Sequence, residues 1–319
     1  MNSNFWKNKK VVVTGGKGFL GTHLVKRLAK LKPLKIFPPT KKEFDLRIYE
    51  NCLKAFKNAD IVIHLAGNVG GIGYNQKNPA DLFDDNILMG VNCMRAAKAT
   101  GVKKYVALGT ICAYPKYTPV PFKEKDLWNG YPEETNAPYG LAKKMLLVQS
   151  QAYRQQYNFN SIYLLPVNLY GPEDNFDPES SHVIPALIKK FVDAKKNNSK
   201  EVIIWGSGNP TREFIYVEDA VRGILLATEK YNKPDPINIG SGSEISIKHL
   251  AEAIAKEVNF KGYITFDKTK PDGQPRRKLD VSKAKKEFGF IANTTFKVGL
   301  KKTILAYLKE YQYQNHGQV

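Results

Sequence analysis

Tyr139 and Lys143 are the residues whose types and spacing best suit acid–base chemistry, four positions apart near the start of a helical pattern. Residues four apart lie on one face of a helix, so we expect the phenol and the ammonium to be neighbours. A nearby ammonium favours the phenolate and lowers a phenol pKa from its usual value of about 10. Such a tyrosine can exchange a proton with a substrate oxygen while a hydride moves. Thr110 ends a predicted strand, and its hydroxyl could bond the same oxygen.

A glycine-rich loop upstream could hold the hydride carrier. Gly15, Gly18 and Gly21 stand between an apolar run at 10–14 and a helical pattern at 18–30. Glycines there permit a tight turn and a close backbone approach to a pyrophosphate, and the helix start supplies free N–H groups. The context of strand, loop and helix makes this a dinucleotide-binding pattern.

The residues after the second predicted strand, 34–37, indicate which dinucleotide is bound. NAD-binding proteins usually place Asp or Glu there, whereas NADP-binding proteins use cations for the 2′-phosphate. Here the chain continues Pro-Pro-Thr-Lys-Lys, with Lys41 and Lys42 and no acid. The sequence therefore predicts a preference for NADP(H).

Strand and helix patterns alternate through the first half of the chain, which positions these residues. Apolar runs end at 14, 37, 65, 108 and 166, and helical patterns at 18–30, 48–56, 79–100 and 138–157 separate them. Continuous apolar strands between helices are typical of a parallel sheet covered on both faces. We therefore predict an α/β fold: a Rossmann-like doubly wound parallel sheet with a smaller C-terminal α/β substrate-binding region. The expected boundaries are 1–170 for the Rossmann domain, with 214–240 returning to it, and 171–213 plus 241–319 for the substrate-binding region.

Composition narrows the class further. The chain has 319 residues and a formal net charge of +19, but its lysines are scattered, which fits anionic substrates without requiring nucleic acid. No apolar run approaches the roughly 20 residues of a membrane span, and no signal-peptide core is visible, so we expect a cytoplasmic protein without membrane contacts. Cys52, Cys93 and Cys112 have no paired spacing, and no histidine cluster has metal-ligand spacing, so no disulfide or metal is expected.

Long segments of the chain resemble a known family. His64–Gly73 reads HLAGNVGGIG, Gly109–Lys116 reads GTICAYPK, and Pro166–Ala186 reads PVNLYGPEDNFDPESSHVIPA. Trp205–Asp219 reads WGSGNPTREFIYVED, and Lys270–Asp280 reads KPDGQPRRKLD. With the glycine loop and Tyr139-x-x-x-Lys143, these segments make the chain similar to the GDP-L-fucose synthase family of the extended short-chain dehydrogenase/reductases. The resemblance covers nearly the whole chain.

The resemblance implies an NADPH-dependent 3,5-epimerisation and 4-reduction of a GDP-4-keto-6-deoxy-hexose, and a homodimer. It implies that Thr110, Tyr139 and Lys143 form the reductase triad, with Thr110 in place of the usual serine, and that Cys112 and His182 are the epimerisation pair. A thiol and an imidazole have usual pKa values of about 8.5 and 6.5, which suit proton transfer beside a keto group at neutral pH. Which of the two is base and which is acid stays open.

The resemblance also implies two sets of binding residues. For NADP(H) these are Gly15, Gly16, Lys17, Gly18, Phe19, Leu20, Gly21, Lys41, Leu65, Ala66, Leu108, Gly109, Thr110, Tyr139, Lys143, Pro166, Val167, Asn168, Leu169 and His182. For the GDP-sugar they are Asn168, Lys190, Trp205, Arg212 and Asp272.

Departures from the family pattern leave other functions open. Ile111 replaces a residue that is more often small and polar, and Lys190 replaces a frequent arginine and loses its bidentate fork on phosphate. A 4-reductase or epimerase for another GDP-sugar, such as a GDP-6-deoxy-heptose, is the main alternative. A 4-epimerase or 4,6-dehydratase of the same fold is a further alternative, although Ile111-Cys112 stand where a dehydratase usually has Asp-Glu. A dinucleotide sensor without activity and a nucleic-acid binder rank lower, because Tyr139 and Lys143 are both present and only the charge suggests nucleic acid.

Overall fold

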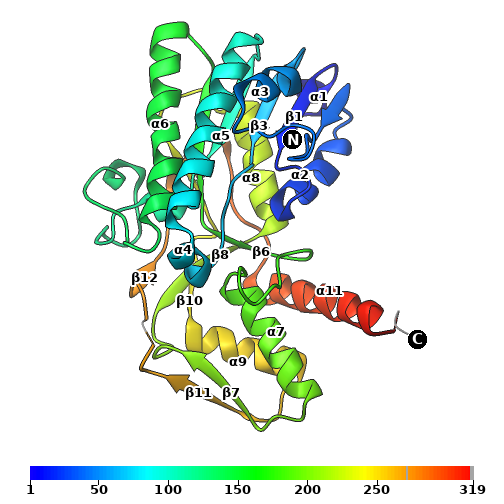
Figure 1. Ribbon diagram of the computed structural model, residues 1–319, viewed down its shortest axis with the longest axis vertical. Coiled ribbons are helices and arrows are strands. Elements are labelled where there is room, and N and C mark those ends of the chain that lie inside the picture. The colour runs from blue at the N-terminus through cyan, green and yellow to red at the C-terminus, as the bar shows by residue number, and fades with distance from the viewer. Residues whose placement is uncertain (271, 317–319) are drawn as a thin grey trace.

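A six-stranded parallel sheet forms the larger part of the computed structural model, which describes residues 1–270 and 272–316 (Figure 1). Its strand order is β2-β1-β3-β4-β5-β9. The strands are β1 (Lys10–Thr14), β2 (Lys35–Phe37), β3 (Ile61–His64), β4 (Lys104–Leu108), β5 (Ser161–Pro166) and β9 (Ile237–Ile239). The central strands are valine- and isoleucine-rich and buried throughout, as a parallel sheet between two helical layers requires. The predicted Rossmann-like α/β fold is confirmed.

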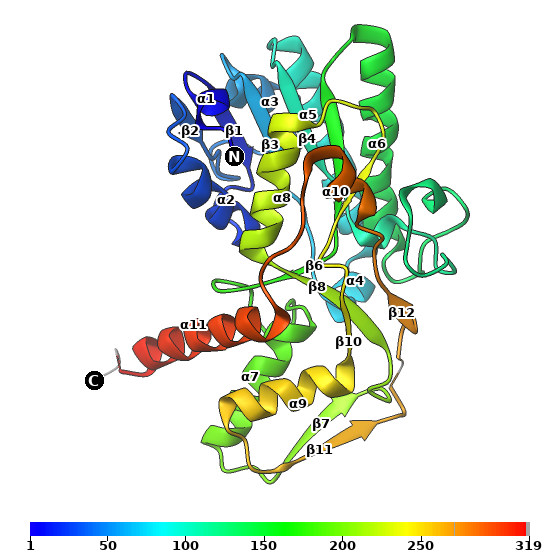
Figure 2. The ribbon, with the colours of Figure 1, turned by 180° about the vertical axis from the view of Figure 1, so that it is seen from behind.

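Helices cover both faces of this sheet. One layer contains α3 (Tyr49–Phe56), α5 (Pro79–Ala99) and α6 (Ala137–Tyr157). The opposite layer contains α2 (Phe19–Ala29), α8 (Val217–Lys230) and α10 (Ser282–Phe288), seen from behind in Figure 2. A short helix, α1 (Ser3–Trp6), precedes the first strand and buries Trp6 in the core.

A second, smaller region with its own hydrophobic core lies beyond the carboxyl ends of the large sheet (Figures 1 and 2). Its larger sheet has the order β10-β8-β12, with β6 also paired to β8, and its smaller sheet pairs β11 with β7. The strands are β6 (Asn168–Tyr170), β7 (Glu201–Trp205), β8 (Thr211–Tyr216), β10 (Glu244–Ser246), β11 (Tyr263–Asp267) and β12 (Arg276–Arg277). The helices are α7 (Val183–Lys196), α9 (Ile247–Val258) and α11 (Phe296–His316), of which α11 extends away from the body.

The positions at which the chain passes from one region to the other differ from the predicted boundaries in two places. The return to the large sheet begins with α8, because β8 belongs to the smaller region. A second return follows near the C-terminus, where α10 packs against α8 and β9. Phe288 and Phe290 carry this contact, since both are buried in the core of the large sheet.

Several short helices were not predicted from the sequence. They are α1, α4 (Ile72–Lys77) in the segment after β3, and 3₁₀ turns at Ile111–Ala113 and Glu124–Asp126. Of these, α4 and the turn at Ile111–Ala113, directly after β4, lie where the two regions meet. No described helix combines the length and the apolar character that crossing a bilayer demands.

Candidate active site

The glycine loop lies at the carboxyl ends of β1 and β3, where the strand order reverses. Ligands of open α/β sheets bind at such a switch point. Gly15 adopts a φ of +66°, and a Cβ there would lie 2.8 Å from the backbone nitrogen of Ala66. A Cβ on Gly21 would lie 2.0 Å from the carbonyl oxygen of Gly15. Only glycine fits these two positions, and the start of α2 presents its free N–H groups beside them, so the loop fits a dinucleotide pyrophosphate.

The other residues expected to bind NADP(H) follow the ends of neighbouring strands. Leu65 and Ala66 come directly after β3, Gly109 and Thr110 after β4, and Val167 after β5. Parallel strands end at one edge of a sheet, so the fold brings these segments together. The end of β2 also lies beside the glycine loop, since a Cβ on Gly16 would lie 2.6 Å from the Cβ of Pro38. Lys41, a little further along, is exposed.

Tyr139 and Lys143 lie in the first turns of α6 and face this edge. Lys143 is buried with only 3% of its side chain exposed. Its carbonyl oxygen accepts a hydrogen bond of 2.8 Å from the hydroxyl of Tyr163 on β5, which ties the helix to the sheet. A Cβ on Gly67, after β3, would lie 3.7 Å from the ammonium nitrogen of Lys143, so this nitrogen borders the predicted cofactor site.

Burial governs the protonation of both residues. It raises the pKa of Tyr139 well above its usual range, and the nearby Cys112 raises it further, while a hydrogen bond with Thr110 acts in the opposite direction. Burial also lowers the pKa of Lys143 to about 8. The prediction that Lys143 lowers the phenol pKa is therefore wrong for the protein without ligands. The physical reason is that desolvation disfavours the charged form of each group.

Cys112 lies in the 3₁₀ turn that follows β4. Thr110 is the N-cap of this turn, and its hydroxyl accepts a hydrogen bond of 3.2 Å from the backbone N–H of Cys112. The half-buried thiol donates to the side-chain oxygen of Asn136 at 3.7 Å. Cys112 and Tyr139 are close enough for the thiol to affect the phenol pKa, so one site contains both.

His182 is the N-cap of α7 in the smaller region, and its side chain is exposed. Desolvation by the surrounding protein lowers the pKa of this imidazole, although part of the ring reaches solvent, and this favours its neutral form. The unpredicted helix α4 joins this segment to the rest of the site. The N–H of Gly71, just before α4, donates 3.1 Å to the carbonyl of Ser180, and Asn75 within α4 donates 3.3 Å to Asn136 beside Cys112.

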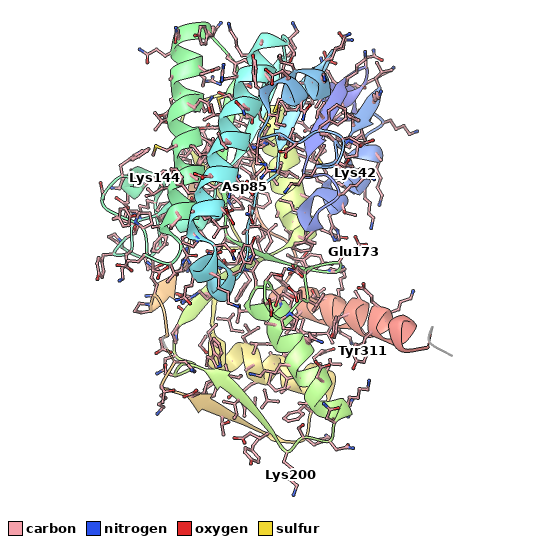
Figure 3. The ribbon with its side chains drawn as sticks, in the orientation of Figure 1. Lys42, Asp85, Lys144, Glu173, Lys200 and Tyr311 are labelled. Atoms are coloured by element: carbon pink, nitrogen blue, oxygen red, sulfur yellow. The ribbon has the colours of Figure 1, made fainter. Side chains whose placement is uncertain are left out.

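The segment before His182 also contacts the glycine-loop helix. Glu173 accepts a hydrogen bond of 2.6 Å from Lys26 of α2, and the carbonyl of Pro172 lies 2.8 Å from a ring nitrogen of His23. Figure 3 shows Glu173 at the level where the two regions meet, well away from Lys200 at the tip of the smaller region. The acid–base residues thus lie in the junction between the regions.

Arg212, expected to hold the GDP-sugar, forms a cationic pair with a residue that was not predicted. The parallel register of β8 and β12 places Arg277 directly beside it. The Nε of Arg277 is buried and has no partner among the described residues. Burial first, and then the charge of Arg277, lower the pKa of Arg212 to about 10. Two adjacent guanidinium groups suit a diphosphate. No pattern in the sequence could reveal this pairing, because the register joins residues far apart in the chain.

The remaining residues expected to bind the GDP-sugar, Trp205, Asp272 and Lys190, lie in the same smaller region, and the carbonyl of Asp272 accepts a hydrogen bond from Arg212. Trp205 exposes 68% of its side chain, with the ammonium of Lys270 5.6 Å from its ring centre. Asp272 accepts 2.6 Å and 2.7 Å hydrogen bonds from the N–H and hydroxyl of Ser207. Lys190 donates to the carbonyl of Ile203. An exposed indole is available to stack on a flat base.

The structure also shows where two other singled-out residues, Ile111 and Asn168, lie. Ile111 is buried, and its side chain packs in the hydrophobic core around the large sheet. Asn168 on β6 donates 3.1 Å to the carbonyl of Glu213, which connects the end of β5 to β8. Within residues 1–270 and 272–316, no group of three or more His, Cys, Asp and Glu side chains could hold a metal ion.

Comparison with known proteins gives the family. Residues 11–240 match the model of the NAD dependent epimerase/dehydratase family. The "Probable GDP-L-fucose synthase 1" of Oryza sativa subsp. japonica is 40% identical over 307 residues, which cover 95% of this chain and 93% of the relative. An NADP-bound GDP-L-fucose synthetase from Naegleria fowleri superposes with a TM-score of 0.87 at 29% identity, covering 96% of each chain. A GDP-6-OMe-4-keto-L-xylo-heptose reductase from C. jejuni gives 0.89 at 29% identity, covering 99% of each. The chain belongs to the NAD dependent epimerase/dehydratase family and, within it, to the GDP-L-fucose synthases.

Proposed function

We propose that this protein uses NADPH to invert C3 and C5 of a GDP-4-keto-6-deoxy-hexose and to reduce C4, yielding GDP-L-fucose or a close relative. One observation carries the proposal. The reductase residues Thr110, Tyr139 and Lys143 share a site with Cys112, and α4 joins that site to the segment of His182. A plain reductase needs no thiol beside its tyrosine.

NADPH supplies the hydride when it is bound. The glycine loop and the start of α2 would hold its pyrophosphate, Lys41 would contact the 2′-phosphate, and Lys143 would hold the nicotinamide ribose. Tyr139 would give its proton to the C4 oxygen of the sugar as the carbonyl group becomes an alcohol. The raised pKa of Tyr139 keeps the phenol protonated at neutral pH, as this direction of reaction requires.

Epimerisation precedes reduction, because the keto group at C4 is what makes the protons on C3 and C5 acidic. One member of the Cys112–His182 pair removes the proton from carbon on one face, leaving an enolate. The other member returns a proton to the opposite face, so each centre is inverted without net loss of hydrogen. A thiol and a neutral imidazole can each exchange a proton at neutral pH.

The GDP part binds in the smaller region. In this proposal Arg212 and Arg277 bind the diphosphate and Trp205 stacks on the guanine. Asp272 and Lys190 line the same GDP site. We infer that the sugar then lies at the junction, next to Cys112 and Tyr139.

A second candidate is the C4 reduction of a GDP-linked heptose. The likeness to the C. jejuni heptose reductase over 99% of both chains favours it. The buried position of Ile111 removes one reason to expect an altered sugar pocket, whereas Lys190 in place of arginine remains a difference at the substrate.

Product analysis separates these functions. The protein is incubated with NADPH and GDP-4-keto-6-deoxymannose in D₂O, with absorbance at 340 nm and NMR as readouts. We expect NADPH oxidation and a GDP-L-fucose product with deuterium at C3 and C5. Protein that binds NADPH but leaves it unoxidised with this substrate would contradict the proposal, and turnover of a GDP-4-keto-heptose instead would favour the second candidate.

Membership of the family also leads us to propose a homodimer in the cytoplasm. Light scattering coupled to size-exclusion chromatography tests the first part, with twice the chain mass of 35.9 kDa as the expected result.

A further inference from the structure

Asn136 occupies the N-cap of α6, yet its side chain does not cap the helix. Asparagine at this position normally accepts a hydrogen bond from an N–H two or three residues further on. Here the amide bonds to Cys112 and Asn75, which come from other parts of the junction, and to its chain neighbours Glu133 and Thr135. These side chains, and not the N–H groups of the helix, set the orientation of the amide.

The partners of Asn136 determine which way the amide points. Its oxygen accepts from the thiol of Cys112 at 3.7 Å and from the side chain of Asn75 at 3.3 Å. Its nitrogen donates to the carboxylate of Glu133. The hydroxyl of Thr135 donates to the same carboxylate oxygen at 2.7 Å and helps to fix it. Because an ionised carboxylate only accepts hydrogen bonds, the amide nitrogen must face Glu133, and the amide oxygen must then face Cys112.

The backbone of Cys112 is already fixed by other contacts. Thr110 bonds its N–H, and a Cβ on Gly140 of α6 would lie 2.3 Å from its carbonyl oxygen, so helix and turn are in direct contact. One torsion, the rotation about the Cα–Cβ bond, then decides where the sulfur points. Asn136 is the hydrogen-bond partner that selects this rotamer.

We propose that Asn136, oriented by Glu133 and Asn75, is a positioning residue that aims the thiol of Cys112 at the sugar for epimerisation. The inference rests on the proposed function, in that it takes Cys112 as one of the epimerisation pair. Asn75 comes from α4, which also contacts the segment before His182. The same short helix therefore orders both sides of the pair.

The variant Asn136→Ser tests this role. Serine is also a favoured N-cap residue, so the start of α6 is retained. We expect solvent-deuterium exchange at C3 and C5 of the keto-sugar to fall about tenfold, because a small misplacement of a reacting group is costly. The affinity for NADPH should stay within about twofold.

Asn129→Ser is the matched control. It is the same change in the same loop, at an exposed residue that, among the described residues, bonds only to Asp126. It should behave as wild type.

Alkylation by iodoacetamide gives a readout that does not depend on activity. Cys52 and Cys93 are fully buried, so labelling of the native protein reports on Cys112. We expect Asn136→Ser to raise the labelling rate at pH 7 about fivefold, the effect of losing one neutral hydrogen bond. Asn75→Ser, which leaves α6 intact, should shift both readouts in the same direction by less, and it replaces Asn136→Ser should that variant fail to fold.

Three outcomes overturn the inference. Unchanged exchange and labelling in folded Asn136→Ser would show that the amide does not control the thiol. Changed labelling with unchanged exchange would show that thiol position does not limit epimerisation. Lost exchange with unchanged labelling would place Asn136 on the substrate itself. Failure of the proposed function is distinct, because Cys112→Ser would then leave exchange unchanged.

Discussion

Burial sets the chemistry of single residues in this site. Burial shields both Tyr139 and Lys143 from water. It raises the pKa of the phenol, whose charged form is an anion, and lowers the pKa of the ammonium, which is itself the charged form. His64, under the same site, has 1% of its side chain exposed, and burial lowers its pKa to about 3. The neutral imidazole lies 2.8 Å from the hydroxyl of Thr14 and ties the ends of β1 and β3 together. His64 is therefore a structural residue of the cofactor site.

Replacing Tyr139 tests the proton donor directly. In Tyr139→Phe the ring still fills its place, but no proton is available for the C4 oxygen. We expect the rate of NADPH oxidation to fall at least about a hundredfold, the usual contribution of a positioned acid. NADPH binding, followed by fluorescence, should be retained. A Tyr139→Phe protein that reduces the keto-sugar at the wild-type rate would remove the phenol from the mechanism.

The pH dependence of NADPH use should report Lys143. Its pKa lies at about 8 in the ligand-free protein, below the usual lysine value of 10.5, so the ammonium is charged below pH 8 and loses its charge as the pH rises. We expect kcat/KM for NADPH to be level below pH 8 and to fall above it, because kcat/KM follows ionisations of the free enzyme. In Lys143→Arg, whose guanidinium stays charged, any remaining activity should lack this decline. A decline at the same pH in Lys143→Arg would assign it to another group.

At the scale of elements, one buried carboxylate holds the two regions together. Glu213 on β8 is completely buried and accepts 2.7 Å and 2.6 Å hydrogen bonds from the N–H groups of Gly242 and Leu279. Burial raises its pKa, while those bonds act in the opposite direction. Gly242 lies in the turn before β10, and Leu279 lies where the chain returns toward α10. Glu213 thus joins both crossings between the regions.

Removing this carboxylate should destabilise the protein. In Glu213→Ala the buried N–H of Leu279 and the part-buried N–H of Gly242 lose their acceptor, and we expect the free energy of unfolding to fall by about 3 kcal/mol. Glu213→Gln keeps one acceptor oxygen and should lose less. Urea unfolding monitored by tryptophan fluorescence provides the measurement. Equal losses in the two variants would mean that the charge, and not the hydrogen bonds, supplies the stability.

The order of helices and strands follows from the sequence with few exceptions. The buried strands and long helices of the first half were predicted within one or two residues, because hydrophobic periodicity is strong in them. The missed elements are short and include α1, α4, β6, β8, β9, β10 and β12. Segments of two to six residues carry too little periodicity, and neighbours distant in the chain stabilise them instead.

At the scale of the whole molecule, the formal charge of +19 is the dominant electrostatic feature. The 49 basic residues outnumber the 30 acidic residues by 19, and the repulsion between the excess cations opposes the compact state. The paired cations of the smaller region, Arg212 and Arg277, suit a diphosphate.

Salt should therefore stabilise the protein. Raising NaCl from 0.02 to 0.3 M shortens the screening length from roughly 20 Å to roughly 6 Å. We expect the Tm to rise by at least about 1 °C, as about 1 kcal/mol of relieved repulsion would produce in a chain of this size. KCl should have the same effect, since screening does not distinguish the two ions. A Tm that is flat or falls with salt would show that repulsion between exposed lysines is not significant.

The sequence by itself determined the fold class, the glycine loop, the Tyr139–Lys143 pair and the resemblance that singled out Cys112 and His182. These depend on residue type and local spacing, which the chain displays directly. Only the tertiary structure decided that burial raises the pKa of Tyr139, that Arg277 lies beside Arg212, and that Asn136 turns from capping its helix to bond Cys112. Desolvation, strand register and contacts between distant segments arise only when the chain packs. The spacing of residues along the chain therefore does not predict them.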